Sequence, residues 1–352
     1  MLNKEIGSEF WEADQKPNGK FYPGERVATS LLSGRTALDF IVRDIKVSGK
    51  ICSAYLPSYC CHSMIQPFLD NGVDVKFYRV TFVNGTFVYD LDSLADYDAV
   101  LIMQYFGFGN LDVKEQIRCC KEQGKIVIED ATHSFFSETP YCGLSDYVFA
   151  SIRKWTGLPG GAVAFKHSGD FLVAFPRETN SRFIEMRTLA AELKRQYICG
   201  ISTEKEVFLD FFARAEDLLE KDYSDYNLPE ELEKRLCFLD SEKIISGRRR
   251  NAALLIEKIK KLSAVETPTL KSGDVPLFVP IFLPVGRRNE LRRYLIERAV
   301  YCPVHWPASQ AYSEQETSLS TRELSLICDQ RYSETDMMYI SELVCDFWEG
   351  KK

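Results

Sequence analysis

Three short apolar runs, at residues 126–128, 147–150 and 162–165, constrain the fold of this chain more than any other feature. Short runs of this kind are typical of buried strands. The first run leads to Asp130 and the second to Lys154. If the strands lie side by side, both side chains project from the same edge of one sheet, where open α/β folds bind ligands. The sequence therefore predicts an acid and a lysine together at that edge.

The chain before these runs alternates between strand-like and helix-like segments with short connections. Strands are expected at 51–56, 75–80, 99–105 and 126–129, and helices at 37–47, 60–71 and 112–123. This alternation predicts an α/β fold with a mainly parallel central sheet and helices on both faces.

The rest of the chain has a different character. Amphipathic patterns predict helices at 183–197, 204–221 and 229–261. A smaller α/β region follows, with a strand at 278–283 and helices at 289–298 and 334–348. We expect an N-terminal arm (1–30), a large domain (31–235, with a helical segment at about 171–222) and a small C-terminal domain (236–352).

Composition excludes several classes of function. The net charge of −7 and the absence of a basic face argue against nucleic-acid binding. No stretch reaches the roughly 18 apolar residues that a membrane span requires, and the N-terminus lacks the apolar core of a signal peptide. The cysteines number eleven, an odd count, and form no Cys-x-x-Cys pair, which favours reduced thiols in a cytoplasmic protein.

Asp130 and Lys154 together match what pyridoxal 5'-phosphate (PLP) needs. The lysine forms a Schiff base with the aldehyde, and the carboxylate keeps the pyridine nitrogen protonated so that the ring can accept electrons. Alone, each has an ordinary explanation, as a surface lysine or a helix-capping aspartate. His133 can contact the cofactor's phenolic oxygen or the aspartate. A zinc site is disfavoured, because the chain has 4 His and no clustered ligands, and no metal is expected.

Ser33-Gly34-Arg35-Thr36 precedes a predicted helix, so its backbone N–H groups face the place where an anion binds well. The ordinary alternative is a helix N-cap at Ser33. The spacing matches neither the dinucleotide fingerprint nor the P-loop, so a single phosphate fits better than a dinucleotide. Ser151 can add a hydroxyl to the same phosphate.

Two nucleophile motifs are weaker alternatives. Ser151 and Lys154 have the Ser-x-x-Lys spacing of β-lactamases, but the accompanying Ser-Asp-Asn and Lys-Thr-Gly motifs are absent from the sequence. Cys60 or Cys61 could pair with His62 as a thiol nucleophile, but no third, orienting group is evident.

The chain resembles the DegT/DnrJ/StrS family of fold-type-I PLP enzymes, best known as sugar aminotransferases. The matching blocks cover most of the chain apart from the helical stretch near 171–222: 33–38, 56–59, Gly72, 75–80, 129–133, 151–161, 226–230, 249–252 and 302–307. The resemblance implies that Lys154 is the Schiff-base lysine and Asp130 the partner of the pyridine nitrogen. It places His133 near the phenolic oxygen, and Ser151 and Gly34, Arg35 and Thr36 at the phosphate.

The resemblance also implies an activity and an assembly. An amino group would move from an amino acid such as glutamate to a keto-sugar or related carbonyl acceptor. Sugar dehydratases of this family are expected to carry histidine in place of the lysine, so Lys154 disfavours that reaction. The enzyme would be a homodimer in which the Tyr226 region crosses to the partner, and Tyr226, Asn227 and His305 are candidate substrate or trans-subunit residues.

Three departures from the family pattern keep alternatives open. Cys60-Cys61 stands where the family has threonine and a ring-stacking aromatic, and Asp225-Tyr226-Asn227 stands where it has Asn-Tyr-Arg. Leu158-Pro159-Gly160-Gly161 replaces Gly-Glu-Gly-Gly. The alternatives to an aminotransferase are a different PLP reaction on the same fold and a non-catalytic sensor or regulatory protein.

Overall fold

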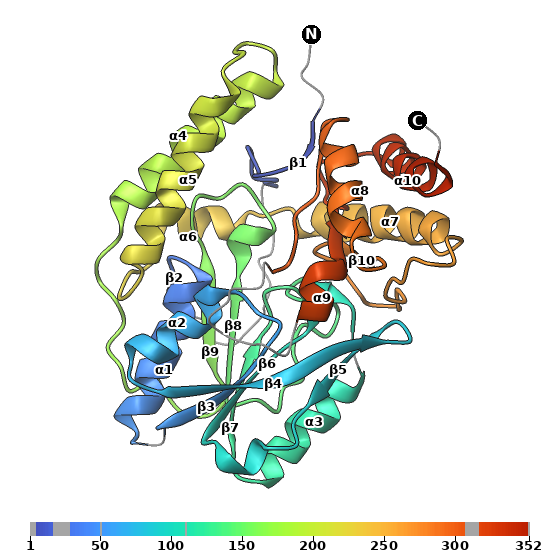
Figure 1. Cartoon of the computed structure of the whole chain (residues 1–352). Helices are drawn as coiled ribbons and strands as arrows, with labels where there is room; N and C mark the ends of the chain where they lie inside the picture. The colour runs from blue at the N-terminus through green and yellow to red at the C-terminus, as the bar shows by residue number, and fades with distance from the viewer. Residues whose placement is uncertain (1–4, 17–28, 50, 110, 307–316, 351–352) are drawn as a thin grey trace.

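The computed structural model describes residues 5–16, 29–49, 51–109, 111–306 and 317–350. Its centre is an eight-stranded sheet in the order β2-β9-β8-β7-β6-β3-β4-β5 (Figure 1). The five strands from β8 to β4 are parallel, and β9, β2 and β5 are antiparallel to their neighbours. The predicted mainly parallel α/β sheet is confirmed. The strands are β2 (Thr29–Leu31), β9 (Ala162–Lys166), β8 (Tyr147–Ser151), β7 (Ile126–Asp130), β6 (Ala99–Met103), β3 (Ser53–Pro57), β4 (Asp74–Val83) and β5 (Thr86–Asp90).

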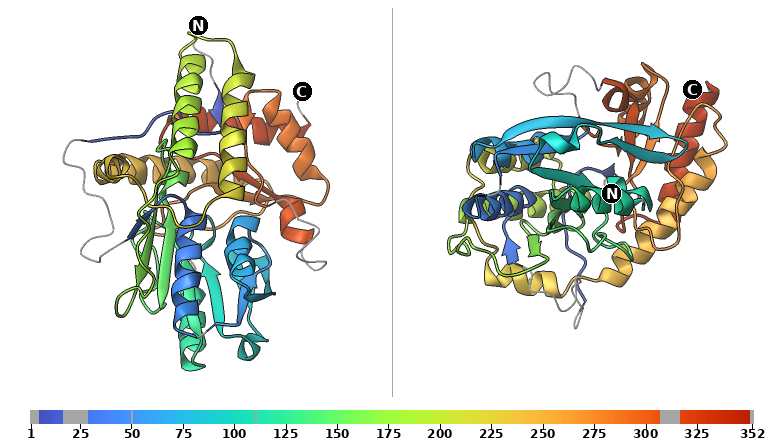
Figure 2. Two further views of the ribbon diagram at one scale, coloured as in Figure 1. Left: turned by 90° about the vertical axis from the view of Figure 1, so that its left-hand side faces the viewer. Right: turned by 90° about the horizontal axis from the view of Figure 1, so that it is seen from below.

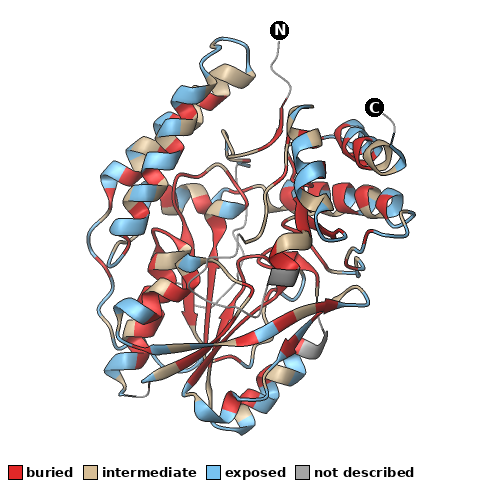
Figure 3. Cartoon of the chain, in the orientation of Figure 1, coloured by how far each residue is buried: buried red, intermediate tan, exposed pale blue. Residues whose placement is uncertain are grey.

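The inner strands are buried on both faces, as Figure 3 shows in red. All residues of β6 and β8 are buried, which explains why these strands appear in the sequence as continuous apolar runs rather than alternating ones. Along β8, Tyr147 and Phe149 pack in one apolar cluster with α1 (Gly34–Val47), while Val148 and Ala150 pack in a second cluster with α6 (Glu230–Cys237). Helices therefore cover both faces of the sheet at β8. The other helices predicted in this half are α2 (His62–Asp70) and α3 (Leu111–Glu122).

The strand predicted at 75–80 is longer than expected and forms a hairpin that we did not predict. β4 continues to Val83, and β5 returns from Thr86, which pairs with Val83 across a two-residue turn. Asn84 and Gly85 both have positive φ, at 51° and 78°. Asn-Gly is the common sequence for such a turn, because both residues tolerate left-handed backbone angles. The signal was therefore present in the sequence.

The helix predicted at 229–261 is wrong as a single element. It is two helices, α6 and α7 (Ser241–Ile259), separated at Asp240. The side chain of Asp240 accepts a hydrogen bond from the N–H of Lys243 and so caps α7. The interruption also contacts the N-terminal segment, since the N–H of Asp240 donates to the carbonyl of Asp14.

The C-terminal region forms a smaller layer beside the large sheet. β10 (Val279–Phe282) and β12 (Glu323–Leu326) pair antiparallel, and β1 (Ile6–Gly7) pairs parallel with β11 (Val300–Tyr301). α8 (Arg287–Ile296) and α10 (Glu334–Glu349) confirm the two helices predicted there, and α9 (Thr317–Arg322) is additional. The division into arm, large domain and small domain stays a prediction.

Helices α4 (Ser181–Ile198) and α5 (Lys205–Lys221) form an antiparallel hairpin that extends beyond the rest of the molecule (Figure 2, left). They confirm the two helices predicted in this region. Phe208, Phe212 and Ala190 pack between them, and Leu219 packs with Leu32 at the base of the hairpin. The base of α5 therefore lies against the edge of the large sheet.

The described part of the N-terminal arm packs on its own chain. Arg331 lies over the rings of Phe10 and Trp11, at 3.9 and 4.7 Å from their centroids. Phe21 and Tyr22, the other aromatic residues of the predicted arm, lie outside the described residues. Within the described ranges, no helix is both long enough and apolar enough to cross a membrane.

Candidate active site

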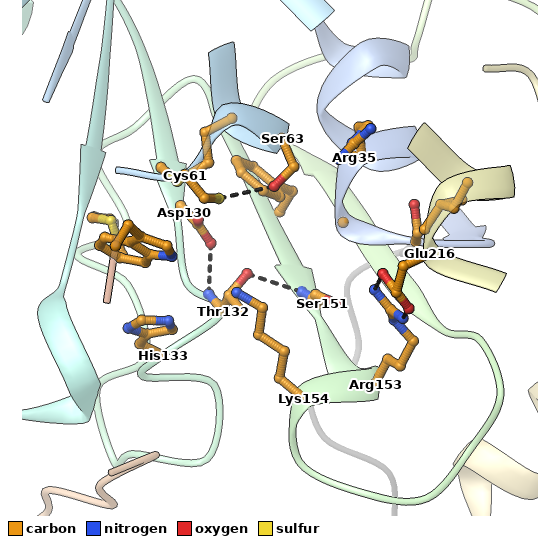
Figure 4. A pocket seen from close by; sticks show the side chains of 17 residues that line it. Arg35, Cys61, Ser63, Asp130, Thr132, His133, Ser151, Arg153, Lys154 and Glu216 are labelled. Carbon is orange, nitrogen blue, oxygen red and sulfur yellow. Dashed lines mark hydrogen bonds and ion pairs between the residues drawn. The ribbon is translucent and has the colours of Figure 1, made fainter. Parts of the chain in front are cut away.

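Asp130 and Lys154 line the same cavity at the carboxyl ends of β7 and β8, as the sequence predicted. The two strands are neighbours in the sheet, with Asp130 opposite Phe149. Figure 4 shows Lys154 extending from the turn after β8 toward the side that holds Asp130, Thr132 and His133. The lining residues also include Ser33, Gly34, Arg35, Cys61, Ser63, Met64, Met103, Ser151, Arg153, Glu216, Leu219 and Trp306.

Lys154 ends a single 3-10 turn, η3 (Ile152–Lys154), that directly follows β8. The next residue, Trp155, is fully buried, and its indole N–H donates to the carbonyl of Thr132 at 2.7 Å. The carbonyl of Trp155 in turn accepts from Gln330 at 2.8 Å. These contacts fix the turn, while Lys154 itself is exposed to the cavity and has no hydrogen-bond partner among the described residues.

Asp130 is the last residue of β7 and is only 4% exposed. One of its carboxylate oxygens, Oδ1, accepts a hydrogen bond from the N–H of Thr132 at 2.8 Å. Burial raises the pKa of Asp130, although Thr132 and the charge of Lys154 act in the opposite direction. A buried carboxylate of this kind gains from a cationic N–H group placed beside it.

His133 is buried, and its Nδ1 accepts a hydrogen bond from the N–H of Phe106 at 3.1 Å. The ring proton must therefore be on Nε2. Nε2 is buried, has no partner among the described residues, and belongs to a side chain that lines the cavity. Burial, together with the charge of Lys154, lowers the pKa of His133 well below its usual value. His133 is thus a neutral hydrogen-bond donor whose Nε2–H is available to a group bound in the cavity.

The N-terminus of α1 forms the anion-binding end of the cavity. Ser33 is the N-cap, and its hydroxyl accepts from the N–H of Thr36 at 3.2 Å. A Cβ atom on Gly34 would lie 2.9 Å from Cβ of Ser151, so only glycine lets the end of β8 approach the helix this closely. Arg35 also lines the cavity, and its Nη1 donates to Gln66 at 2.8 Å.

The structure does not bring every predicted residue into this cavity. Thr36 is not among the lining residues, and its hydroxyl donates to the carbonyl of Tyr223 at 2.8 Å. Tyr226 and Asn227 lie along β2 of their own chain, where the N–H of Leu32 donates to the carbonyl of Tyr226. His305 lines a neighbouring cavity that it shares with Lys154.

Several lining residues were missed by sequence reasoning. Glu216 of α5 accepts from both Arg153 and Arg187, the latter at 2.6 Å. Although burial opposes it, the two guanidinium groups lower the pKa of Glu216 to about 2. Thr132 accepts from the N–H of Ser151 at 3.0 Å and ties the ends of β7 and β8 together. No local sequence pattern predicts that Glu216 lines the cavity, because it belongs to a helix far along the chain. Thr132 could have been predicted, since it lies inside the 129–133 motif.

An aromatic ring reaches the cavity from a distant segment. Trp306 lies almost parallel to His133, with ring centroids 5.8 Å apart and planes inclined by 20°. At Cys61, where the family pattern has an aromatic residue nearby, the thiol instead contacts the hydroxyl of Ser63 at 2.8 Å. Nδ1 of His62 lies 3.9 Å from Oε1 of Glu220. The thiol-nucleophile alternative stays a hypothesis.

Solved structures of similar shape exist, although no protein-family model and no curated protein matches the chain. An aminotransferase of Helicobacter pylori, PseC, is 14% identical and has a TM-score of 0.68, with 99% of this chain and 100% of that chain covered. TlmJ, an aminotransferase of Streptoalloteichus hindustanus, is 15% identical with a TM-score of 0.65, and 98% of each chain is covered.

A third similar structure is a dehydratase rather than an aminotransferase. The GDP-4-keto-6-deoxy-D-mannose-3-dehydratase of E. coli, solved with bound hydrated PLP, is 15% identical with a TM-score of 0.61; the match covers 91% of this chain and 88% of that chain. Identities this low establish a shared fold and leave the reaction open. The chain has the fold-type-I architecture of PLP-dependent enzymes, in agreement with the predicted fold class.

Proposed function

We propose that this protein is a PLP-dependent aminotransferase. The observation that carries the proposal is the meeting, in one cavity, of a free lysine, a buried carboxylate, a histidine donor without an acceptor and a helix N-terminus. Each of these groups matches a different part of the PLP molecule. Lys154 matches the aldehyde, Asp130 the pyridine nitrogen and His133 the phenolic oxygen.

The buried Nε2–H of His133 is the strongest indication that PLP matches this cavity. A buried polar group without a partner costs about 1–3 kcal/mol, so its persistence calls for a ligand that accepts the bond. At the other end, the N–H groups of Gly34 and Arg35 and the hydroxyl of Ser151 would hold a phosphate, helped by the α1 dipole. We retain Thr36 as a residue that supports this end through its bond to Tyr223.

Bound PLP would supply an electron sink for the bonds at the α-carbon of an amino acid. The chain's own residues would do the rest. Lys154 Nζ would take the proton from the α-carbon of the donor and later return a proton, as a general base and then a general acid. Asp130 would hold a proton on the pyridine nitrogen, and His133 would orient the ring.

We propose an amino acid such as glutamate as the donor and a keto-sugar or related carbonyl compound as the acceptor. The similar structures support the choice of acceptor, since PseC is an aminotransferase involved in the biosynthesis of pseudoaminic acid. The presence of Lys154 favours amino transfer over dehydration. The dehydratase among the similar structures keeps a different PLP reaction as the second candidate.

A half-reaction tests the proposal. Protein loaded with PLP should show the visible absorption band of lysine-bound pyridoxal, and glutamate should bleach the band and yield 2-oxoglutarate. A keto-sugar nucleotide that accepts the amino group should restore the band. Lys154→Ala should abolish these changes, whereas Lys260→Ala, at an exposed lysine after α7, should retain them.

The other outcomes separate the alternatives. Failure of every amino donor to bleach the band would contradict amino transfer and favour another PLP reaction. Bleaching without turnover of any acceptor would favour a sensor. Retention of the band in Lys154→Ala would refute the assignment of the lysine.

We also propose that the protein is a cytoplasmic homodimer. Leu189, Ile201 and Val207 on the α4–α5 hairpin are 44%, 70% and 37% exposed, and a partner subunit on this hairpin would cover these apolar side chains. The structure places none of the cysteines that it describes in a disulfide, which fits a reducing compartment. Light scattering should give about twice the chain mass of 40.4 kDa; a mass equal to one chain would contradict the dimer.

A further inference from the structure

A second cavity lies beside the first and shares Lys154 with it. Its wall includes His305 and Phe278 from the C-terminal region. The ring of His305 is held between aromatic rings, with centroid distances of 5.1 Å to Phe278, 5.3 Å to Trp306 and 5.4 Å to Phe106. The imidazole therefore has a fixed orientation next to the reactive lysine.

His305 is the outer member of a chain of three hydrogen-bonded groups. Its Nδ1 lies 2.8 Å from the hydroxyl of Ser325, and that hydroxyl lies 2.5 Å from Oε1 of Glu323. The second carboxyl oxygen of Glu323, Oε2, accepts from the backbone N–H of His305 at 2.7 Å. Nε2 of His305 has no hydrogen-bond partner among the described residues, so it is the end of the chain that a ligand in the cavity can reach.

Glu323 is fully buried, and no lysine or arginine forms an ion pair with it among the described residues. Burial raises the pKa of Glu323 to about 8, against the smaller effects of Ser325, His305 and Arg288. Burial and the charge of Lys154 lower the pKa of His305 to about 3. The acid can therefore hold a proton near neutral pH, while the imidazole is neutral.

The position of one proton then decides what His305 offers to the cavity. When Glu323 is protonated, Oε1–H donates to Ser325, Ser325 donates to Nδ1, and the ring proton of His305 must be on Nε2. When Glu323 is ionised, Ser325 donates to Oε1 and accepts from Nδ1–H, so Nε2 presents a lone pair. The proton must be on Oε1 in the first state, because Oε2 already accepts from the N–H of His305.

We propose that Glu323, Ser325 and His305 form a proton relay that ends at Nε2 of His305 and serves the carbonyl acceptor. This role rests on the proposed amino transfer, in which the acceptor's oxygen leaves as water and needs protons. In the step, Nε2–H gives its proton to that oxygen, the Ser325 proton moves to Nδ1, and the Glu323 proton moves to Ser325. The relay ends with ionised Glu323, and a solvent proton restores it.

His305 would contact the acceptor and is the catalytic member, while Ser325 and Glu323 act through it. Arg288 of α8 and Cys302 lie near Glu323, and Lys154 and His133 lie near His305. The backbone carbonyl of His305 also accepts a hydrogen bond from the hydroxyl of Tyr59. The other charged side chains that line the cavity in front of His305 are Glu9, Arg153, Arg187, Lys205, Glu216, Arg248, Arg292, Asp329 and Arg331.

The tautomer of His305 can be read directly by nitrogen NMR of PLP-free protein labelled at histidine. The signals are few, because the chain has 4 His. We expect His305 to change from Nε2–H to Nδ1–H as the pH rises through the pKa of Glu323, about 8. Glu323→Gln should hold it as Nε2–H throughout, because an amide in place of Oε1 donates permanently. Ser325→Ala should abolish the coupling.

Two controls keep the measurement interpretable. His133 should remain Nε2–H in every variant, because Phe106 donates to its Nδ1, and its unchanged signal shows that the site is folded. Ser341→Ala removes another buried serine, whose hydroxyl donates to Met338 within α10, and should leave the His305 transition unchanged. A His305 tautomer that ignores pH, or the same transition in Glu323→Gln, would overturn the relay.

Kinetics then test how the relay is used. In PLP-loaded Ser325→Ala, glutamate should still bleach the visible band at the wild-type rate, because this change needs no proton transfer at a carbonyl oxygen, whereas the acceptor half-reaction should be slowed by about 100-fold. If Ser325→Ala ran the acceptor half-reaction at the wild-type rate, the relay would have no role in protonating the acceptor. If the wild type itself lacks the glutamate half-reaction, the proposed function fails, while the NMR result still decides whether the relay exists.

Discussion

The two sides of Lys154 are built in different ways. On one side, β7, β8 and the N-terminus of α1 present Asp130, Ser151 and Gly34 at the ends of neighbouring elements of one sheet. On the other side, Arg153 is joined to α4 and α5 through Glu216 and Arg187, and His305 is held by Glu323 of β12. The first side is set by strand order alone, whereas the second requires segments far apart in the chain to dock.

The two sides of the site should therefore respond differently to substitution. Side chains at strand ends are placed by the backbone and by sheet packing, so substituting one of them should change the reaction rate more than the free energy of unfolding. Other side chains are held by buried ion pairs and hydrogen bonds between distant segments. Substituting one of those should lower the free energy of unfolding.

Asp130→Asn should give the largest loss of activity and little loss of stability. The amide keeps the size of the side chain and can still accept from Thr132, but it cannot hold a proton on a pyridine nitrogen. We expect kcat of the glutamate half-reaction to fall by about 10²–10⁴-fold, with PLP still bound and an unchanged melting temperature. A large drop in melting temperature with a normal kcat would show that Asp130 stabilises the fold and does not take part in the reaction.

Glu216→Ala should act mainly on stability. The change leaves the guanidinium groups of Arg153 and Arg187, which are 16% and 6% exposed, without their shared carboxylate. Because Glu216 is itself 44% exposed, we expect a loss of roughly 1–3 kcal/mol in the free energy of unfolding, below the 3–5 kcal/mol of a fully buried pair.

The matched control for this change is Glu230→Ala, which removes an exposed carboxylate paired with Lys234 on α6. Denaturant unfolding should show no measurable change in that variant. Equal losses for the two variants would show that the cluster around Glu216 does not tie the hairpin to the sheet.

Glu323 should make stability depend on pH. Burial raises the pKa of Glu323 from its usual value of 4.5 to about 8 in the folded protein, so the folded state binds the proton more tightly than the unfolded state. The stabilisation is full below about 4.5 and is lost as the pH rises toward 8. Glu323→Gln should flatten this slope in chemical unfolding between pH 5 and pH 8. An unchanged slope would show that Glu323 is ionised in the fold.

Two helix caps offer the finest comparison. Ser33 caps α1 at the cavity, and Ser333 caps α10 in a capping box with Asp336, far from it. Each serine-to-alanine change should cost about 1 kcal/mol of stability. Only Ser33→Ala should also weaken PLP binding in a fluorescence titration. Equal PLP affinities in the two variants would show that the N-terminus of α1 does not bind the phosphate of PLP.

The same contrast explains how much could be predicted from the sequence. The parallel strands, Asp130, Lys154, His133 and the turn before α1 were predictable, because each lies in a contiguous motif whose position in the sheet follows from strand order. Thr36 was assigned too simply, since helix geometry turns its hydroxyl toward Tyr223. The hairpin at Asn84-Gly85 was readable in principle and was missed.

Long-range docking was not predictable. No local pattern signals that α5 brings Glu216 to Arg153, or that Trp306 comes to lie beside His133. At the break between α6 and α7, the N–H of Asp240 donates to the carbonyl of Asp14 in the N-terminal segment, a contact that helical periodicity does not reveal. The domain boundaries and the trans-subunit role of Tyr226 and Asn227 remain predictions for the same reason.

If Lys154, among all the lysines, holds PLP in this cavity, borohydride should fix the cofactor on that residue. The experiment is reduction of the PLP-loaded protein with borohydride, followed by proteolysis and mass spectrometry. We predict a single phosphopyridoxyl group on the peptide that contains Lys154. The Lys154→Ala variant, in which Asp130 is unchanged, should carry no such group. A modification spread over surface lysines, or located on another lysine, would contradict the account.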